Sequence, residues 1–170
     1  MTQEDRAFEP PESSPRGVPA LLALVGFIGL CLLVGAAGST LTADSVRGWY
    51  LTLNRPPGVP PSWAFPVVWT TLYVMMGTAA WLAWRQPAHR AALLLWGWQL
   101  LANALWTPAF FGLHSPRLGL LVLAVLLPLI ALTLRAFLRL DRRAGFLMLP
   151  YLLWTLYATY LNLGFWWLNP

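Results

Sequence analysis

The sequence predicts an all-α integral membrane protein, built as a five-transmembrane-helix bundle. The chain is 58% hydrophobic and only 10% charged, whereas soluble domains carry about 25% charged residues. Its apolar residues gather in long runs without alternation, which is typical of helices and not of strands. Each run approaches the roughly 20 residues that a helix needs to cross a bilayer core. At 170 residues the chain is expected to form one domain.

The apolar runs predict five spans, separated by short polar or proline-containing connections. The spans are expected at residues 19–41, 66–84, 91–113, 118–138 and 144–168. Most connections are short, so neighbouring helices should be antiparallel. The exception is a loop at 42–65, in which four prolines impose stiff, polyproline-like geometry.

The first 18 residues are polar and net acidic, and they predict a disordered N-terminal tail ahead of the membrane domain at 19–170. A cleaved secretory signal is disfavoured, because such a signal begins with a basic region and has a shorter apolar run.

Arginine placement predicts the orientation. The chain has eleven basic residues, all of them arginine. Eight lie in the tail, in the connection after the second span, and around the connection after the fourth; only Arg47, Arg55 and Arg117 lie on the opposite side. Positive charge favours the cytoplasmic side, so the N-terminus is expected inside, and the C-terminus and the long loop outside.

The spans contain few groups for conventional chemistry. No acidic residue lies between Asp44 and Asp141, whereas pumps and proton-coupled transporters mark their paths with ionisable residues. A retinal Schiff base is excluded because the chain has no lysine. Cys31 is alone and the two histidines lie at helix ends, so neither a metal site nor a required cofactor is predicted. No acid–base dyad or nucleophile–base pair appears either.

Tryptophan is the most unusual component, with eleven copies. Most of them lie near predicted span ends, where an aromatic belt at the headgroup level explains them. Trp69, Trp106 and Trp154 lie further inside their spans.

These inner tryptophans fall on stripes of residues that share one helix face. The stripes are Trp69, Tyr73, Gly77 and Ala80; Gln99, Asn103 and Trp106; and Tyr151, Trp154, Ala158 and Asn162. Ordinary helix packing through small residues and amides would produce one such stripe. Three of them on separate helices favour a concave, mostly apolar ligand site.

Four motifs resemble one known family. They are WYLTLNRP at 49–56, PPSWAFPVVWTTLY at 60–73, NALWTPAFFG at 103–112 and PYLLWTLYATYLN at 150–162. In this order, over roughly residues 35–169, the chain resembles the TspO or tryptophan-rich sensory protein family, which includes the mitochondrial translocator protein.

This resemblance implies a five-helix bundle whose ligand cavity is closed by the lid loop 42–65, and a homodimer. Family members bind porphyrins and other haem-pathway tetrapyrroles, and mitochondrial forms also bind cholesterol. Some bacterial members degrade protoporphyrin in light through two tryptophans, which look like Trp69 and Trp154. The other ligand-binding positions of the family look like Tyr50, Pro60, Tyr73, Asn103, Trp106 and Ala158.

The sequence departs from the family pattern twice. Gly58 stands in the lid where many members carry an aromatic residue, which predicts a less bulky lid. No basic residue follows Tyr157 or Tyr160, so the cholesterol motif proposed for mitochondrial members is incomplete.

The expected function is a receptor or sensor that binds protoporphyrin or a related tetrapyrrole in a bacterial cell membrane. Indole rings stack on the flat macrocycle, and its propionates should point to the mouth. There Arg47 or Arg55 could bind them, although both arginines could equally contact lipid phosphates. Slow light-dependent degradation of the porphyrin is a second possibility. Facilitated transport of a tetrapyrrole or a sterol-like lipid is the alternative.

Overall fold

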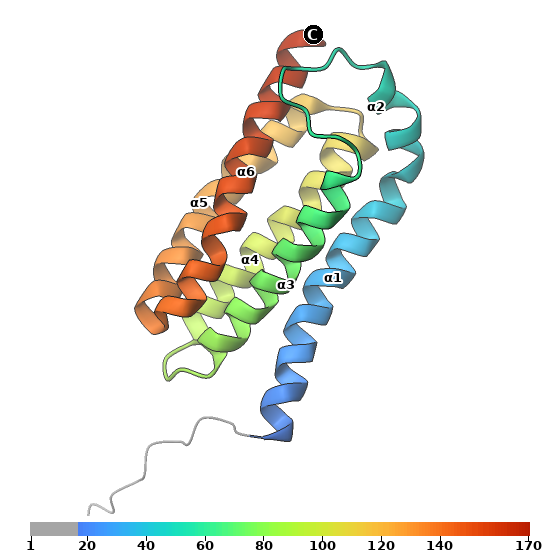
Figure 1. The fold of residues 1–170 in the computed structure, drawn as a ribbon. Helices are drawn as coiled ribbons and strands as arrows, with labels where there is room; N and C mark the ends of the chain where they lie inside the picture. Colours follow the sequence, from blue (N-terminus) through green and yellow to red (C-terminus); the bar gives the residue numbers. More distant parts are fainter. Residues whose placement is uncertain (1–16) are drawn as a thin grey trace, which may run out of the picture.

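The computed structural model describes residues 17–170, which fold into five long helices, one short helix and one π-helical turn (Figure 1). The helices are α1 (Val18–Arg47), α2 (Trp49–Thr52), α3 (Ala64–Trp84), α4 (Arg90–Thr107), α5 (Pro116–Leu140) and α6 (Arg142–Leu168), and the π-helical turn η1 is Pro108–Gly112. No strand occurs in this part of the chain, so the predicted all-α class is confirmed. The tail predicted at 1–18 lies almost wholly outside the described residues.

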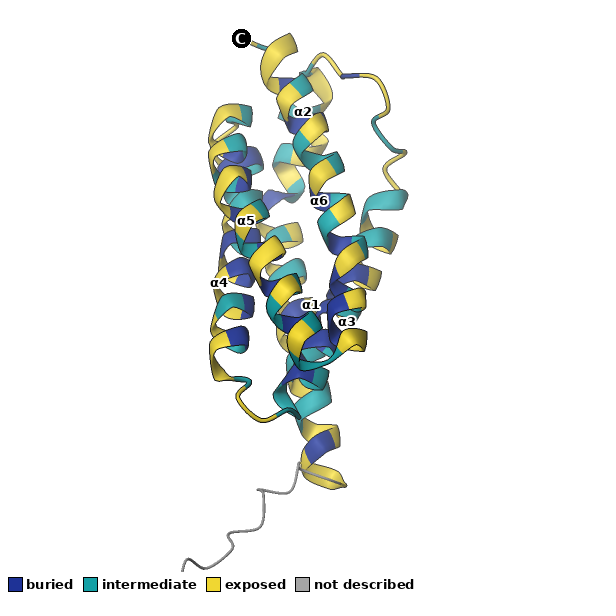
Figure 2. Ribbon diagram, turned by 90° about the vertical axis from the view of Figure 1, so that its left-hand side faces the viewer, coloured by how far each residue is buried: buried dark blue, intermediate teal, exposed yellow. Residues whose placement is uncertain are grey.

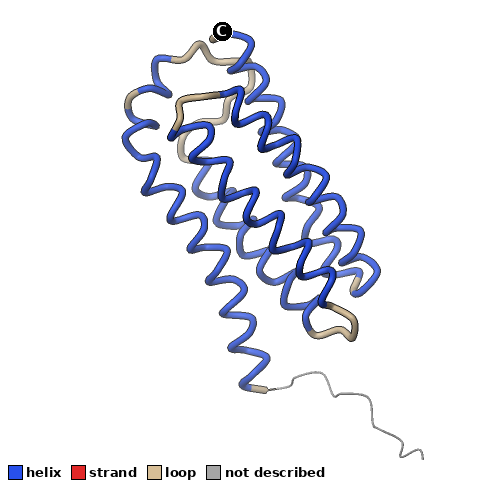
Figure 3. Tube along the Cα trace, turned by 180° about the vertical axis from the view of Figure 1, so that it is seen from behind, coloured by secondary structure: helices blue, strands red, loops and turns tan. Residues whose placement is uncertain are grey.

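The long helices run up and down, with α1 packed on α3, α3 on α6, α6 on α5, and α5 on α4. A weaker contact between α4 and α1 completes the ring. The connections lie at the two ends of the bundle, as the view from behind shows (Figure 3). The segment 53–63, which we call the lid, crosses the end of the bundle at which the C-terminus lies (Figure 1). We call that end the lid end.

The long loop is shorter than predicted. The expected loop 42–65 was wrong at its start, because α1 continues to Arg47 and Trp49–Thr52 is helical. The sequence between Thr42 and Arg47 is polar but contains no glycine or proline that would end a helix. Gly48 ends α1, and its N–H donates to the Asp44 carbonyl at 2.9 Å.

Within residues 17–170, four helices are long and apolar enough to cross a membrane. These are α1, α3, α5 and α6, with mean hydropathies of 2.6, 1.3, 2.5 and 1.3. The 18-residue α4 is not among them. It carries Arg90, Gln99 and Asn103, which lower its mean hydropathy. Beyond Thr107 the chain continues helically through η1 as far as Gly112.

The outer surface of the bundle is apolar, as expected for contact with lipid. Large hydrophobic side chains project outward from every long helix, among them Leu33 (69% exposed) and Leu94 (66%). Only 6% of the most apolar window of α1 is buried. Figure 2 shows the exposed positions along the outward faces of the helices. Soluble monomers rarely expose contiguous apolar surface on this scale.

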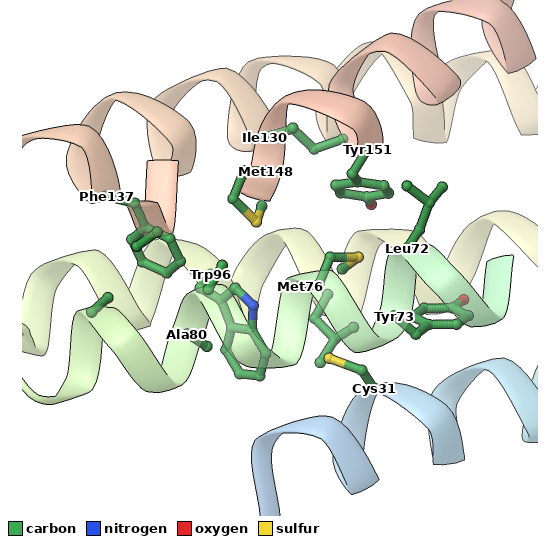
Figure 4. Close-up of a cluster of buried hydrophobic side chains, with 14 of the residues drawn as sticks. Cys31, Leu72, Tyr73, Met76, Ala80, Trp96, Ile130, Phe137, Met148 and Tyr151 are labelled. Atoms are coloured by element: carbon green, nitrogen blue, oxygen red, sulfur yellow. The ribbon is translucent and has the colours of Figure 1, made fainter. Parts of the chain in front are cut away.

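At the end of the bundle away from the lid, α3 packs closely through small residues. Ala79, Ala80 and Ala83 are completely buried. A Cβ atom added to Gly77 would lie 2.6 Å from the Cα of Ile28, so α1 and α3 approach most closely there. Larger buried side chains from α4, α5 and α6 fill the neighbouring core (Figure 4). We call this part of the bundle, around Gly77, Ala80 and Ala83 of α3, the packed half. The part next to the lid, around Trp69 and Tyr73 of α3, is called the lid half.

Candidate ligand-binding site

The predicted ligand-binding residues come from α2, the lid, α3, α4 and α6. All eight are at least partly buried: Tyr73 and Asn103 are buried, and Tyr50, Pro60, Trp69, Trp106, Trp154 and Ala158 are half-buried. The structure distributes six of them over three neighbouring groups rather than around one point, while Pro60 lies in the segment 53–63 and Ala158 on α6.

The first group joins α3, α4 and α6. The Tyr73 hydroxyl donates to Asn103 Oδ1 at 2.9 Å. The Trp69 ring lies 5.5 Å from the Tyr73 ring and 6.3 Å from the Tyr151 ring, measured between centroids. We call these four residues, Trp69, Tyr73, Asn103 and Tyr151, the inner cluster. It is aromatic and uncharged, which suits a flat apolar ligand.

The second group lies where α2 meets η1. The Trp106 ring stacks on Phe110 at 5.5 Å, and the Tyr50 ring packs edge-on against Phe110 at 6.5 Å. The Trp106 Nε1–H donates to Asn162 Oδ1 at 3.1 Å, and the Asn162 amide donates to the Pro116 carbonyl at 2.7 Å. Asn162 therefore acts as a link between α4, α5 and α6, which is the ordinary packing role weighed for its stripe.

Trp154 forms the third group, at the edge between α3 and α6. Its ring lies 6.3 Å from Phe65 and 5.7 Å from Tyr157, so its ring partners differ from those of Trp69. Trp154 and Leu153 line one side of an open groove of about 510 Å³, and Leu72 and Met75 line the other. The groove faces outward, so Trp154 lies between the bundle interior and the bilayer.

The lid is fastened along the last turns of α6. Asn54 and Asn169 exchange hydrogen bonds, with the Asn54 N–H donating at 2.9 Å and the Asn169 amide donating at 3.1 Å. The Tyr160 hydroxyl donates to the Pro57 carbonyl at 3.2 Å, and the Tyr157 hydroxyl donates to the Gly58 carbonyl. We call this set of contacts the lid seam.

Two glycines fit the lid to α6. Gly58 has φ of 88°, a left-handed conformation that disfavours a side chain, which gives a backbone reason for its departure from the family pattern. A Cβ on Gly164 would lie 2.5 Å from Pro56. Sequence reasoning missed the seam; the signal was the spacing of Tyr157, Tyr160 and Gly164, which places them on one face of α6.

An arginine lies at the mouth. The guanidinium carbon of Arg55 is 5.6 Å from the centre of the Tyr50 ring, a distance at which a cation is attracted to an aromatic face. Burial raises the pKa of Tyr50, and the nearby Arg55 charge opposes that rise. Tyr50 is therefore neutral at physiological pH and holds the cation beside the lid.

Deeper in the bundle, several buried polar groups lack partners. Both amide atoms of Gln99 and the Trp96 Nε1–H make no hydrogen bond among the described residues, and the Tyr151 hydroxyl lies near Asn103 and Thr155 without a hydrogen bond of full geometry. Gln99 and Tyr151 are completely buried. Leaving a buried polar group unpaired costs about 1–3 kcal/mol, so these groups mark the least satisfied part of the interior.

The fold and these groups define a multi-pass integral membrane protein with an aromatic, uncharged interior under a proline-rich lid. Its sequence matches the model of the TspO/MBR family over residues 27–168. The chain therefore belongs to the TspO/MBR family, which confirms the resemblance seen in the motifs.

Individual relatives agree. The chain is 42% identical to the tryptophan-rich protein TspO of Chlorobaculum tepidum, over 88% of this chain and 98% of the relative. It is 40% identical to the tryptophan-rich sensory protein of Cereibacter sphaeroides, over 80% and 84%. The translocator protein of Bos taurus is 33% identical, over 90% and 91%. Together with the apolar helices, these bacterial relatives support a bacterial membrane as the location.

Proposed function

We propose that this protein is a membrane receptor or sensor that binds porphyrins and other haem-pathway tetrapyrroles in its lid half. The observation that carries the proposal is the inner cluster, in which Trp69, Tyr73 and Asn103 place aromatic and amide groups together without a charge. A tetrapyrrole is a broad aromatic surface, so it gains by stacking on indole and phenol rings and by leaving water. No resident cofactor is needed, because the porphyrin itself is the ligand.

The charged edge of the ligand belongs at the mouth. The propionates of a porphyrin are costly to bury without a cation, and the interior of the lid half offers none. Arg55, held over the Tyr50 ring at 5.6 Å, is the best-placed partner, and Arg47 ends α1 nearby in the chain. Entry then requires the lid to move, which breaks the hydrogen bonds of the lid seam.

The relatives' names fit this reading. One is a sensory protein and another a translocator protein, which indicates sensing or translocation in those proteins. Both sensing and translocation need ligand binding, which is the activity proposed for this protein.

We also propose that the chain crosses the membrane five times, with α4 and η1 together forming the third crossing. The start of α1 and the α3–α4 and α5–α6 connections lie at the end away from the lid (Figure 1). Those two connections are flanked by Arg85, Arg90, Arg139 and Arg142, which favours that end in the cytoplasm and the lid outside. A C-terminal reporter that is active only on the outer side of the membrane tests this topology: it should be active, and an inactive reporter on a correctly inserted protein would contradict the proposal.

The family implies a homodimer, and we propose one. Gly35 on α1 does not supply its interface. A Cβ on Gly35 would lie 2.4 Å from the Tyr73 ring, so this glycine serves packing within one chain. Gly97 on α4 faces open space, beside exposed Leu94 and Trp98. Light scattering corrected for detergent should give a dimer mass, and a monomer mass would overturn this proposal.

Light-dependent consumption of the porphyrin is a second activity to test. Trp69 lies against two tyrosine rings, and indole and phenol are oxidised far more readily than phenylalanine. Replacing Trp69 and Trp154 with Phe should cost only modest affinity, on the order of 1 kcal/mol for each ring, while slowing any photochemical loss of porphyrin. An unchanged loss rate at matched occupancy would remove the enzymatic role and leave a sensor.

The binding proposal is tested by titrating the purified protein with protoporphyrin in lipid nanodiscs. Intrinsic tryptophan fluorescence should be quenched saturably, because the ligand stacks on indoles. Trp69→Phe should weaken the saturable component, whereas Trp98→Phe, which changes an outward-facing ring that is 60% exposed, should not. The absence of any saturable quenching in both detergent and nanodiscs would contradict the proposal.

A further inference from the structure

One face of α4 carries a row of polar and aromatic side chains that runs from the lid half into the packed half. Trp106, Asn103, Gln99 and Trp96 are spaced three or four residues apart and so share this face. The members nearest the lid are paired: the Trp106 N–H donates to Asn162, and the Asn103 oxygen accepts from Tyr73. The deeper members, Gln99 and Trp96, are not.

Gln99 is the exception among the buried polar residues. Within residues 17–170 these are Thr42, Gln99, Asn103, Thr133, Thr155 and Asn162. The three threonine hydroxyls donate to carbonyls of their own helices at 2.7–2.8 Å, and the two asparagines bond across helices. Only the Gln99 side chain lacks a hydrogen bond in this set.

A second buried polar group lies on α6. The Tyr151 side chain is completely buried, its hydroxyl lies close to Asn103 and Thr155 without a hydrogen bond of full geometry, and its ring packs against Trp69 of the inner cluster at 6.3 Å. Figure 4 shows Tyr151 and Trp96 within the same buried group of side chains. The amide and the phenol are both neutral, and each can donate and accept. They therefore suit a neutral hydrogen-bonding group and not an ion.

We infer that Gln99, assisted by the Tyr151 hydroxyl, is the deepest polar contact of the ligand site. This inference rests on the proposed tetrapyrrole binding. A porphyrin whose propionates stay at the mouth directs its opposite edge inward, towards Gln99. The site should then favour tetrapyrroles that carry a hydroxyl or carbonyl group on that inner edge, because such a group satisfies the amide as it enters.

Two porphyrins provide the test. Protoporphyrin carries vinyl groups on the edge opposite its propionates, and haematoporphyrin carries hydroxyethyl groups at the same positions. The measurement is the ratio of their Kd values in nanodiscs, for wild type and for Gln99→Leu. The cost of dehydrating the hydroxyl is common to both proteins, so the change in the ratio reports the contact with Gln99.

The ratio of the protoporphyrin Kd to the haematoporphyrin Kd should be about tenfold higher for wild type than for Gln99→Leu, because one buried hydrogen bond is worth about that factor. Tyr151→Phe should shift the ratio in the same direction by a smaller factor. Thr133→Val is the matched control, since its hydroxyl is equally buried but already bonded within α5 at 2.7 Å. Gln99→Met replaces Gln99→Leu if the latter does not fold.

The outcomes separate the two proposals. Saturable binding of both porphyrins, with one ratio shared by wild type, Gln99→Leu and Thr133→Val, would overturn the role of Gln99 and leave porphyrin binding intact. Failure of wild type to bind either porphyrin would overturn the proposed function, and the role of Gln99 with it.

Discussion

The two halves of α3 differ in the size of the side chains that they present to the neighbouring helices. In the packed half, Gly77 and Ala80 let α1 come so close that a Cβ on Gly77 would lie 2.6 Å from the Ile28 backbone. In the lid half, Trp69 and Tyr73 present large rings instead, which lie 5.5 Å apart. The small residues allow close packing of two helices in one half, and the large rings of the other half give it surfaces on which a flat ligand can stack. If the proposed function holds, ligand binding belongs to the lid half, and the close packing of the other half contributes stability.

The largest expected effect comes from overfilling the packed half. Gly77→Leu should destabilise the protein by about 3 kcal/mol, because backbone atoms of α1 cannot move aside as a flexible side chain could. Thermal unfolding in detergent, followed by circular dichroism, measures this loss. Gly97→Leu on α4 is the control, since nothing lies within 4 Å of the added Cβ atom. Equal stability of the two variants would show that α1 and α3 are not tightly packed there.

A smaller effect, on affinity, is expected in the lid half. Trp69→Ala should weaken protoporphyrin binding by about 2 kcal/mol, roughly thirtyfold, because a stacking surface is lost. Its melting temperature should fall much less than that of Gly77→Leu. Fluorescence titration and thermal unfolding of the same preparation give both quantities. If Trp69→Ala kept full affinity, the inner cluster would not be the binding surface.

Loosening the lid should change rates more than affinity. The double variant Tyr157→Phe, Tyr160→Phe removes two hydroxyl contacts of the lid seam and keeps the rings. Each exposed hydrogen bond contributes about 0.5–1 kcal/mol, so loss of both should make porphyrin dissociation about five- to thirtyfold faster. Stopped-flow displacement measures the rate. The Thr159 hydroxyl bonds only to its own helix, so porphyrin should dissociate from Thr159→Val at the wild-type rate. Unchanged dissociation in the double variant would mean that the seam does not gate the site.

The smallest expected effect is a pH dependence at the mouth. Burial raises the pKa of Tyr50 in the folded protein, so the folded state keeps this proton longer than the unfolded state does. The stabilisation is complete below the unfolded pKa of about 10 and is lost as the pH rises through the folded value. The stability advantage of wild type over Tyr50→Phe should therefore decline above pH ~10. Parallel stability curves for the two proteins at alkaline pH would contradict this.

The sequence predicted the starts of three helices closely, because a polar or proline-containing connection precedes each apolar run. α3, α5 and α6 begin within two residues of the predicted positions 66, 118 and 144, since Ser115 and Asp141 cap the last two. The end of α1 is not visible in the hydropathy pattern, because the segment from Thr42 to Arg47 is polar and yet helical. Helix formation there depends on the absence of breakers and not on hydrophobicity.

The site was predicted less completely, and for a physical reason. Helical spacing fixes which residues share a face, so the row of Gln99, Asn103 and Trp106 followed from the pattern, whereas the hydrogen bond from Tyr73 to Asn103, between two helices, did not. Spacing within one helix does not fix the rotation of one helix against another. Spacing places Tyr157, Tyr160 and Gly164 on one face of α6 but does not show that the lid packs on that face. It also could not predict the outward position of Trp154.

The most direct test of the account is a structure of the complex with protoporphyrin in a lipid environment. The macrocycle should lie beneath the lid, against Trp69 and Tyr73, with its propionates near Arg55 and its opposite edge towards Gln99. The packed half around Gly77 and Ala80 should be unchanged. A macrocycle bound instead in the outer groove beside Trp154 and Met75, with the inner cluster still closed, would contradict the assignment of binding to the lid half.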